Sequence, residues 1–261
     1  MLKALSKGAA LLSLVVVATG CAKIVENTLK NNPDIIFEAM KKEPVKFIDT
    51  LNEAGREYQG LKAADDRKKA EDAMEKQFSN PLDPEINEKR AIRGPKDAPI
   101  TIVEYSDFQC GYCGKAFKTV EKLMDGEYKG KIRLVYKHLP VTGAPMSRPA
   151  AEVFEAIATM DQEKAYEFHD KVFENQGKLS QGGEDQLKLF VKEVMGGDAG
   201  KVFDKTESEE IQARLAADRE EARKYEIGGT PAFVVNGVFL NGAQPIEKFK
   251  QVIERHLEAK N

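Results

Sequence analysis

The hydrophobic and polar positions change their period several times along the second half of the chain. Residues 100–106 and 131–136 are apolar runs typical of buried strands, and residues 114–124 between them repeat apolar positions with a helical period. Two strands joined by a helix predict a right-handed βαβ unit. The elements predicted after it are a long helical stretch, two short strands and a terminal helix, at about 147–225, 232–236, 238–240 and 245–257. The pattern therefore predicts an α/β fold in the order βαβ, helices, ββα.

The first part of the chain has a purely helical pattern. From about 24 to 78 it is strongly charged, and Pro33 and Pro44 stand where helices can begin. Apolar positions repeat between the two segments at a spacing of eleven residues, about three helical turns, so they share one face. A face this narrow does not form a core by itself. Three alternatives are open: this face packs on the main domain, it packs against a second copy of the chain, or the segment is a plain spacer. We favour a homo-oligomer formed through residues 22–78.

Prolines separate this helical segment from the α/β part. Residues 79–99 contain prolines at positions 81, 84, 95 and 99, which predicts a linker. The predicted organisation is therefore a helical segment at 21–78, a linker at 79–99 and one main domain at 100–261.

The first 20 residues have the pattern of an export signal. Lys3 and Lys7 supply positive charge, residues 8–18 form an apolar run, and small residues follow. This run is too short to cross a bilayer. Ala18-Thr19-Gly20-Cys21 resembles a bacterial lipobox, which implies that Cys21 is acylated and anchors the protein to a membrane; ordinary cleavage nearby is the alternative. We expect a lipoprotein of the bacterial cell envelope, facing the periplasm or the cell surface.

Composition and charge exclude some function classes. Of the 261 residues, 41% are hydrophobic and 32% charged, which fits a globular domain with a charged helical segment. The 43 acidic residues slightly exceed the 40 basic ones and no basic block is present, so nucleic acid is not an expected partner. The histidines, at 138, 169 and 256, lack the spacing of metal ligands, and we expect them to serve packing. Neither a metal nor a cofactor is expected.

Cys110-Gly111-Tyr112-Cys113 carries the candidate chemistry. It follows a predicted strand directly and begins a predicted helix, where two cysteines three residues apart are close enough for a disulfide. Beyond this pair the chain offers only Cys21 and the scattered histidines, so a zinc site lacks ligands. A structural disulfide that closes so short a loop stabilises a fold very little. The motif therefore predicts a redox-active pair.

The two cysteines are expected to differ, and an acidic residue lies nearby. Cys110 is expected at a helix N-terminus, where unpaired backbone N–H groups and the helix dipole favour thiolate over thiol. Such a thiolate attacks and leaves readily. Glu104 lies on the preceding strand and by alternation shares a face with Ile100 and Ile102, and burial of a carboxylate there would raise its pKa. It is a candidate proton shuttle; a strand-end carboxylate that reaches solvent or a lysine is the alternative.

A second motif, Gly229-Thr230-Pro231, follows about 120 residues later. With both motifs and the order of elements in place, residues 90–261 resemble the DsbA-like branch of the thioredoxin-fold thiol-disulfide oxidoreductases. The stretches that carry this resemblance most specifically are 103–113 and 228–233. It implies a thioredoxin fold with a helical insertion at about 145–225, preceded by the N-terminal helical segment.

The resemblance also implies how a substrate is held. The Thr230–Pro231 bond is expected in cis and facing the cysteines, with the backbone of Thr230 free to pair with an extended substrate. An ordinary trans proline at a strand start is the alternative, and the sequence alone favours it. Gly111 and Tyr112 are expected to contact the substrate as well. Enzymes of this group often carry an acid at the place of Glu104, which supports its role as a proton shuttle.

The direction of the reaction is less fixed by the sequence. Gly111-Tyr112 and Thr230 are similar to the residues of dimeric disulfide isomerases, whereas the helical insertion and Phe168-His169-Asp170 look DsbA-like. We favour an isomerase or reductase that acts on exported proteins with thiols or disulfides, recycled by an unidentified membrane protein. A dedicated oxidase and a non-enzymatic lipoprotein or holdase are the alternatives.

Overall fold

The computed structural model describes residues 27–87 and 89–259. The predicted export signal and the predicted lipid-attachment residue, Cys21, lie outside these residues. The chain divides into two compact units, one ending at Glu71 and the other beginning at Asp72. In the described part, none of the helices combines the length and the apolar character that crossing a bilayer requires.

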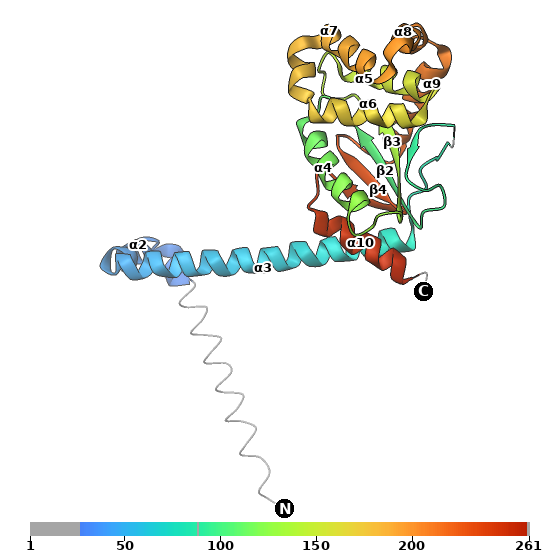
Figure 1. Cartoon of the computed structure of the whole chain (residues 1–261). Coiled ribbons are helices and arrows are strands. Elements are labelled where there is room, and N and C mark those ends of the chain that lie inside the picture. Colours follow the sequence, from blue (N-terminus) through green and yellow to red (C-terminus); the bar gives the residue numbers. More distant parts are fainter. Residues whose placement is uncertain (1–26, 88, 260–261) are drawn as a thin grey trace, which may run out of the picture. The chain divides into compact units, whose positions relative to one another are not determined.

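A five-stranded sheet forms the centre of the second unit, in the order β1-β3-β2-β4-β5. Its central strands β3, β2 and β4 are labelled in Figure 1. Its strands are β1 Ile92–Arg93, β2 Ile100–Ser106, β3 Ile132–His138, β4 Ala232–Val235 and β5 Val238–Asn241. β2 and β3 run parallel, and the other neighbours are antiparallel. Helix α4, Gly111–Asp125, connects β2 to β3, so the predicted βαβ unit is confirmed.

Strand β2 lies in the middle of the sheet and contributes to two cores. Ile100 and Ile102 belong to the larger core, together with α4 and the last helix, α10, Ile246–Glu258. Val103 and Tyr105 belong to the smaller core, which also contains Ala222 near the end of the insertion. Since both faces are covered, nearly every side chain of β2 is removed from water.

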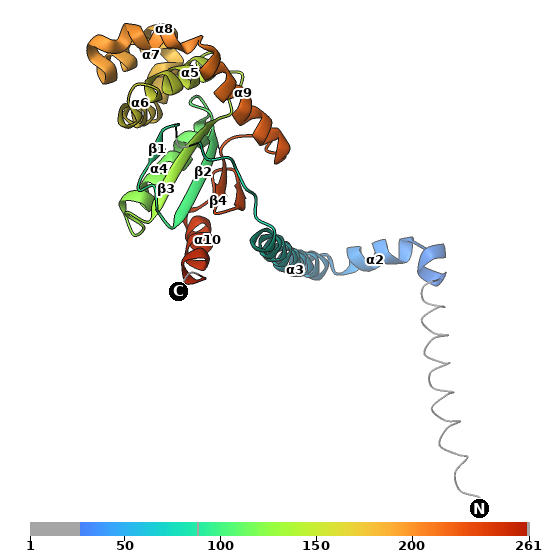
Figure 2. The ribbon, with the colours of Figure 1, turned by 90° about the vertical axis from the view of Figure 1, so that its right-hand side faces the viewer.

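Strand β3 leads into the helical insertion. Its helices are α5 Ser147–Ala158, α6 Gln162–Glu174, α7 Gln176–Met195, α8 Ala199–Thr206 and α9 Glu209–Lys224, with a short 3₁₀ helix, Gly196–Asp198, before α8. Figures 1 and 2 show these helices gathered at one end of the sheet. The side chain of Asp161 caps α6 by accepting two backbone hydrogen bonds. Gly183 interrupts α7 with a φ of 54°, a conformation that favours glycine. The insertion that the resemblance implied is therefore present.

The stretch 79–99, which its prolines predict as a linker, lies within the second unit and packs on its sheet and its insertion. The N–H of Leu82 donates a hydrogen bond to the turn between β4 and β5, and β1 pairs with β3. Arg90 is only 6% exposed and donates to Glu155 of α5 and Asp218 of α9. The prolines predicted irregular backbone, but this packing depends on partners far away in the sequence.

The first unit consists of helices, as the sequence predicts. Helix α2 spans Asp34–Lys42, and helix α3 begins at Pro44 and ends at Ser79, so its last turns belong to the second unit. Several large apolar side chains of this unit are half exposed or more, at 47% for Ile36 of α2, and at 51% for Leu51 and 74% for Val45 of α3. The apolar face of this unit is therefore uncovered within the described residues.

Candidate active site

Cys110 and Cys113 lie where β2 ends and α4 begins. Cys110 occupies the N-cap position of α4, and its carbonyl accepts a hydrogen bond from the N–H of Gly114, with N and O 3.2 Å apart. Both cysteines are free thiols. Cys110 is 7% exposed and Cys113 is fully buried, so Cys110 is the outer of the two. The predicted placement of the pair at a helix start is confirmed.

Hydrogen bonds from outside the motif hold the loop before Cys110. The Asp107 carboxylate accepts from the N–H of Gln109 at 2.9 Å, and from the hydroxyl of Thr142 at 2.7 Å. The carboxamide of Gln176, at the start of α7, donates to the carbonyls of Phe108 and Cys110 at 2.9 and 3.0 Å. The insertion therefore fixes the backbone from which the outer cysteine projects.

The Thr230–Pro231 bond is cis, as the resemblance implied, and it faces the cysteine pair. The thiol of Cys110 donates to the carbonyl oxygen of Thr230, with Sγ and O 3.4 Å apart. The two residues are 120 positions apart in the chain. The two sequence motifs thus meet at one place.

Glu104 lies in the interior, at the middle of β2. Its backbone neighbours are Tyr136 on β3 and Phe233 on β4. Burial raises the pKa of Glu104 to about 7, while the nearby Ser106 hydroxyl and the charge of Arg93 partly oppose this shift. Its Oε1 atom lacks a hydrogen-bond partner among the described residues. The alternative of a carboxylate that reaches solvent or a lysine does not hold in this structure.

Cys113 shares this interior with Glu104. Burial raises the pKa of the Cys113 thiol well above its ordinary value, and the charge of Glu104 raises it further, whereas the Ser106 hydroxyl opposes the shift. The two titratable groups are therefore close enough to influence each other's proton. Glu104, which takes up a proton near pH 7, therefore lies near the thiol of Cys113, which does not ionise readily by itself.

The residues between the cysteines face outward. Tyr112 is 64% exposed, and the ammonium group of Lys115 lies 5.0 Å from the centre of its ring. A Cβ atom added to Gly111 would meet no other atom within 4 Å. The surface around Cys110 therefore has room for an approaching chain.

Sequence reasoning missed several residues that support the site. Asp107 and Gln109 form a local turn, in which the aspartate side chain accepts from the backbone N–H two residues later. The sequence carried a signal for it, because aspartate commonly forms turns in this way. Gln176 and Thr142 carried no such signal, since their contacts join distant segments.

Aromatic rings pack beneath the loop. Phe108 lies between Tyr136 and Phe173, each with its ring centre 5.3 Å away. His138 and His169 are buried among these rings, as expected of packing histidines. Burial lowers the pKa of His169 to about 4, so it is uncharged at neutral pH.

Comparisons with known proteins agree with this geometry. Residues 86–255 match the family model described as Thioredoxin. A probable disulfide bond formation protein D of Bacillus cereus is 32% identical over 171 residues, which cover 63% of this chain and 77% of that protein. A Na(+)/H(+) antiporter, NhaA 1 of Salinispora arenicola, is 34% identical over 174 residues, 66% of this chain, but the match spans only 25% of the antiporter.

Among solved structures, oxidised BdbD of Bacillus subtilis superimposes with a TM-score of 0.60 and 24% identity. The match covers 68% of this chain and 97% of that one. This likeness concerns the fold.

Proposed function

Because the chain belongs to the DsbA-like thioredoxin family of thiol-disulfide oxidoreductases, we propose that it exchanges disulfides with exported proteins in the bacterial cell envelope, chiefly as an isomerase or reductase. One observation carries the proposal, the approach of Cys110 Sγ to the Thr230 carbonyl, 3.4 Å across the site. A reactive sulfur beside a partly exposed backbone that lies just before a strand supports the docking of a peptide disulfide.

The first step is attack by Cys110. Its thiolate attacks one sulfur of a substrate disulfide, a bond forms between Cys110 and that sulfur, and the other substrate sulfur leaves as a thiolate that takes up a proton. The backbone of Thr230 holds the substrate in an extended conformation during this step. Gly111 and Tyr112 form the exposed rim that the substrate contacts.

The mixed disulfide then has two outcomes. In isomerisation, another thiolate of the substrate attacks the substrate sulfur and releases Cys110. In reduction, Cys113 gives up its proton and attacks Cys110 Sγ, which closes the Cys110–Cys113 disulfide and releases the substrate thiolate. Glu104, with a pKa of about 7, is suited to accept the Cys113 proton near neutral pH. Oxidation is the same sequence in reverse.

The direction of disulfide exchange is tested by the reduction potential of the Cys110–Cys113 pair together with two activity assays. A potential of about −180 mV or below, reduction of insulin and refolding of a scrambled substrate support the isomerase or reductase. A potential of about −120 mV with net disulfide donation to reduced substrates indicates instead a dedicated oxidase recycled by a membrane partner. Full function of a Cys110→Ala variant would refute both enzymatic forms and indicate a holdase.

Self-association is part of the proposal. The half-exposed apolar positions of α2 and α3 support a homo-oligomer through residues 22–78, since a helix face of this kind is stabilised by a second copy. The acyl-free protein is expected to sediment as an oligomer, and a version without residues 22–78 as a monomer. An unchanged, monomeric mass for both contradicts this part.

Attachment to the membrane is also proposed, on the lipobox-like sequence before Cys21. Mass spectrometry of the mature N-terminus is expected to find an acylated Cys21, and Cys21→Ser is expected to release the protein from the membrane fraction. An unmodified thiol at Cys21, or cleavage at another residue, contradicts this anchor.

A further inference from the structure

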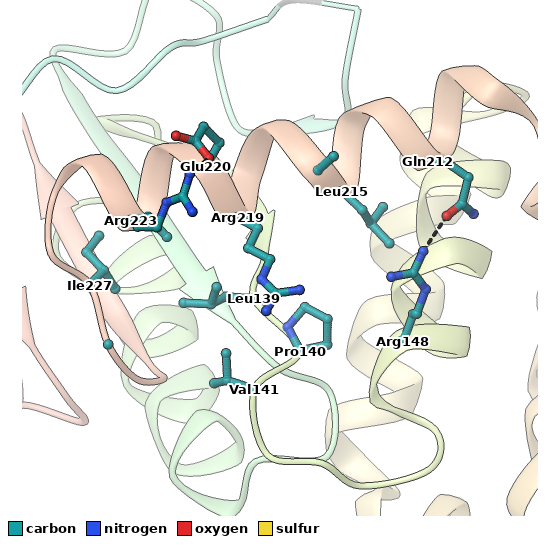
Figure 3. A pocket seen from close by; sticks show the side chains of 13 residues that line it. Leu139, Pro140, Val141, Arg148, Gln212, Leu215, Arg219, Glu220, Arg223 and Ile227 are labelled. Atoms are coloured by element: carbon teal, nitrogen blue, oxygen red, sulfur yellow. Dashed lines mark hydrogen bonds and ion pairs between the residues drawn. The ribbon is translucent and has the colours of Figure 1, made fainter.

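A pocket of about 530 Å³ lies beside the candidate active site and outside the chemistry described so far (Figure 3). Helix α9 forms one wall. The opposite wall includes Pro140 and Val141, from the loop after β3, and the pocket ends at Gly228. Its position at the junction of insertion and sheet places it where two loops of the active site begin.

Both of these loops connect the pocket to Cys110. Gly228 precedes Thr230, whose carbonyl meets the Cys110 thiol, by two residues. Next to Val141, the backbone N–H of Thr142 donates to the Asp107 carboxylate at 3.1 Å, and the Asp107 carbonyl accepts from the N–H of Cys110 at 3.0 Å. A peptide paired with Thr230 therefore has the pocket within a few residues of its reacting cysteine.

The pocket has an apolar base and a cationic rim. Leu139, Leu215 and Ile227 are buried beneath it. The charged residues that line it are three arginines and one glutamate, namely Arg148, Arg219, Arg223 and Glu220. The rim therefore carries an excess of positive charge.

The three arginines differ in how far they are neutralised. Arg223 pairs with Glu220 on the outer surface of α9, and Arg148 pairs with Glu152 at 2.9 Å. Within the described part of the chain, Arg219 has neither a hydrogen-bond nor an ion-pair partner. Figure 3 shows its side chain extending from α9 over Leu139 and Pro140, so an unneutralised guanidinium lies directly above the apolar base.

We propose that this pocket binds a segment of the substrate protein in which acidic side chains stand beside apolar ones, a few residues from the reacting cysteine. Guanidinium groups pair with carboxylates in a planar, two-point geometry, and the apolar base takes the neighbouring side chain. This inference rests on the proposed exchange function and adds a class of substrate to it. The pocket is suited to this role because it borders the same two loops that contact Cys110.

Matched peptides test the inference. Each peptide carries one cysteine activated as a mixed disulfide with thionitrobenzoate, and each has a leucine and three Glu or three Gln placed three to six residues away on either side. Cys110 thiolate attacks the cysteine sulfur and expels the thionitrobenzoate anion, which is measured by its absorbance. Cys113 then attacks Cys110 Sγ and releases the peptide thiolate.

The acidic peptide is expected to react roughly three- to tenfold faster than its neutral partner at low ionic strength, and this advantage is expected to fall with added salt. Arg219→Glu is expected to remove it. Lys224→Glu is the matched control, because it changes the same charge on the same helix outside the pocket lining, and it is expected to keep most of the advantage. The mixed disulfide of mercaptoethanol with thionitrobenzoate is a small substrate without a peptide. It is expected to react at equal rates with the unmodified protein, Arg219→Glu and Lys224→Glu.

Equal rates for the acidic and neutral peptides with the unmodified protein would overturn the inference. So would an equal loss with Arg219→Glu and Lys224→Glu, because overall charge and not the pocket would then decide. If the small disulfide also fails to react, the proposed function itself is wrong and this inference falls with it.

Discussion

The interior carboxylate gives the sharpest prediction about stability. Burial raises the pKa of Glu104 from its ordinary value of 4.5 to about 7, so the folded protein holds this proton more tightly than the unfolded chain does. A raised pKa contributes stability that is fully present below the unfolded value and is lost as the pH rises through the folded value. At 1.36 kcal/mol for each pKa unit, the full loss is about 3 kcal/mol, and roughly 2.5 kcal/mol of it falls between pH 5 and pH 8.

Replacing Glu104 with Gln removes this titration. We expect the free energy of unfolding of Glu104→Gln, measured by urea denaturation of the reduced protein, to rise relative to the unmodified protein by roughly 2.5 kcal/mol from pH 5 to pH 8. Burial, the largest cause of the raised pKa of Cys113, is present in both proteins and keeps this thiol protonated over the range, so thiol titration changes the difference little. Glu167→Gln changes an exposed carboxylate on the surface of α6 and serves as the control.

A difference between Glu104→Gln and the unmodified protein that is constant within about 0.5 kcal/mol from pH 5 to pH 8 refutes the raised pKa. It would equally remove the physical basis for a proton acceptor under the cysteines. The absolute stability of the variant does not enter this test, because only its change with pH is used.

The same substitution, Glu104→Gln, is expected to slow the release of the mixed disulfide by Cys113, measured by rapid quenching; unaltered release rates from pH 6 to pH 8 count against the role. Arg90→Met removes the cation shared by the buried carboxylates of Glu155 and Asp218, although Glu155 keeps Arg214, so we expect unfolding to become easier by about 3 to 5 kcal/mol in denaturant titrations. The exposed Arg67→Met is its control, and an equal effect of both contradicts the buried network. Gln176→Ala removes the side-chain donor of the Phe108 and Cys110 carbonyls, of which the Cys110 carbonyl keeps the Gly114 N–H, and is expected to cost about 1 to 3 kcal/mol in the same titration; an unchanged midpoint contradicts its bracing role.

The sequence predicted the parts of the fold that depend on local pattern. The period of apolar positions gave the βαβ unit, and the placement of Cys110 after a strand gave its position at the start of α4. For Glu104 the sequence left burial and a solvent-facing position open, and the structure shows burial because β2 lies in the middle of a sheet covered on both faces. Motif resemblance, and not periodicity, supplied the cis bond before Pro231.

What the sequence did not predict depends on contacts between distant segments. Arg90 lies in a proline-rich stretch that looks like a linker, yet its partners Glu155 and Asp218 are 65 and 128 residues away. Gln176 reaches the cysteine loop across 66 residues. Neither residue belongs to a motif, and only the folded chain brings its partners together.

The central claim is that Cys110 is the attacking sulfur of a redox pair that docks its substrate at Thr230. The most direct measurement is mass spectrometry of mixed disulfides after the reduced protein meets a peptide disulfide. Cys113→Ser is expected to accumulate a peptide on Cys110, and Cys110→Ser is expected to accumulate none on Cys113. Equal trapping on both cysteines, or none on either, would contradict the account.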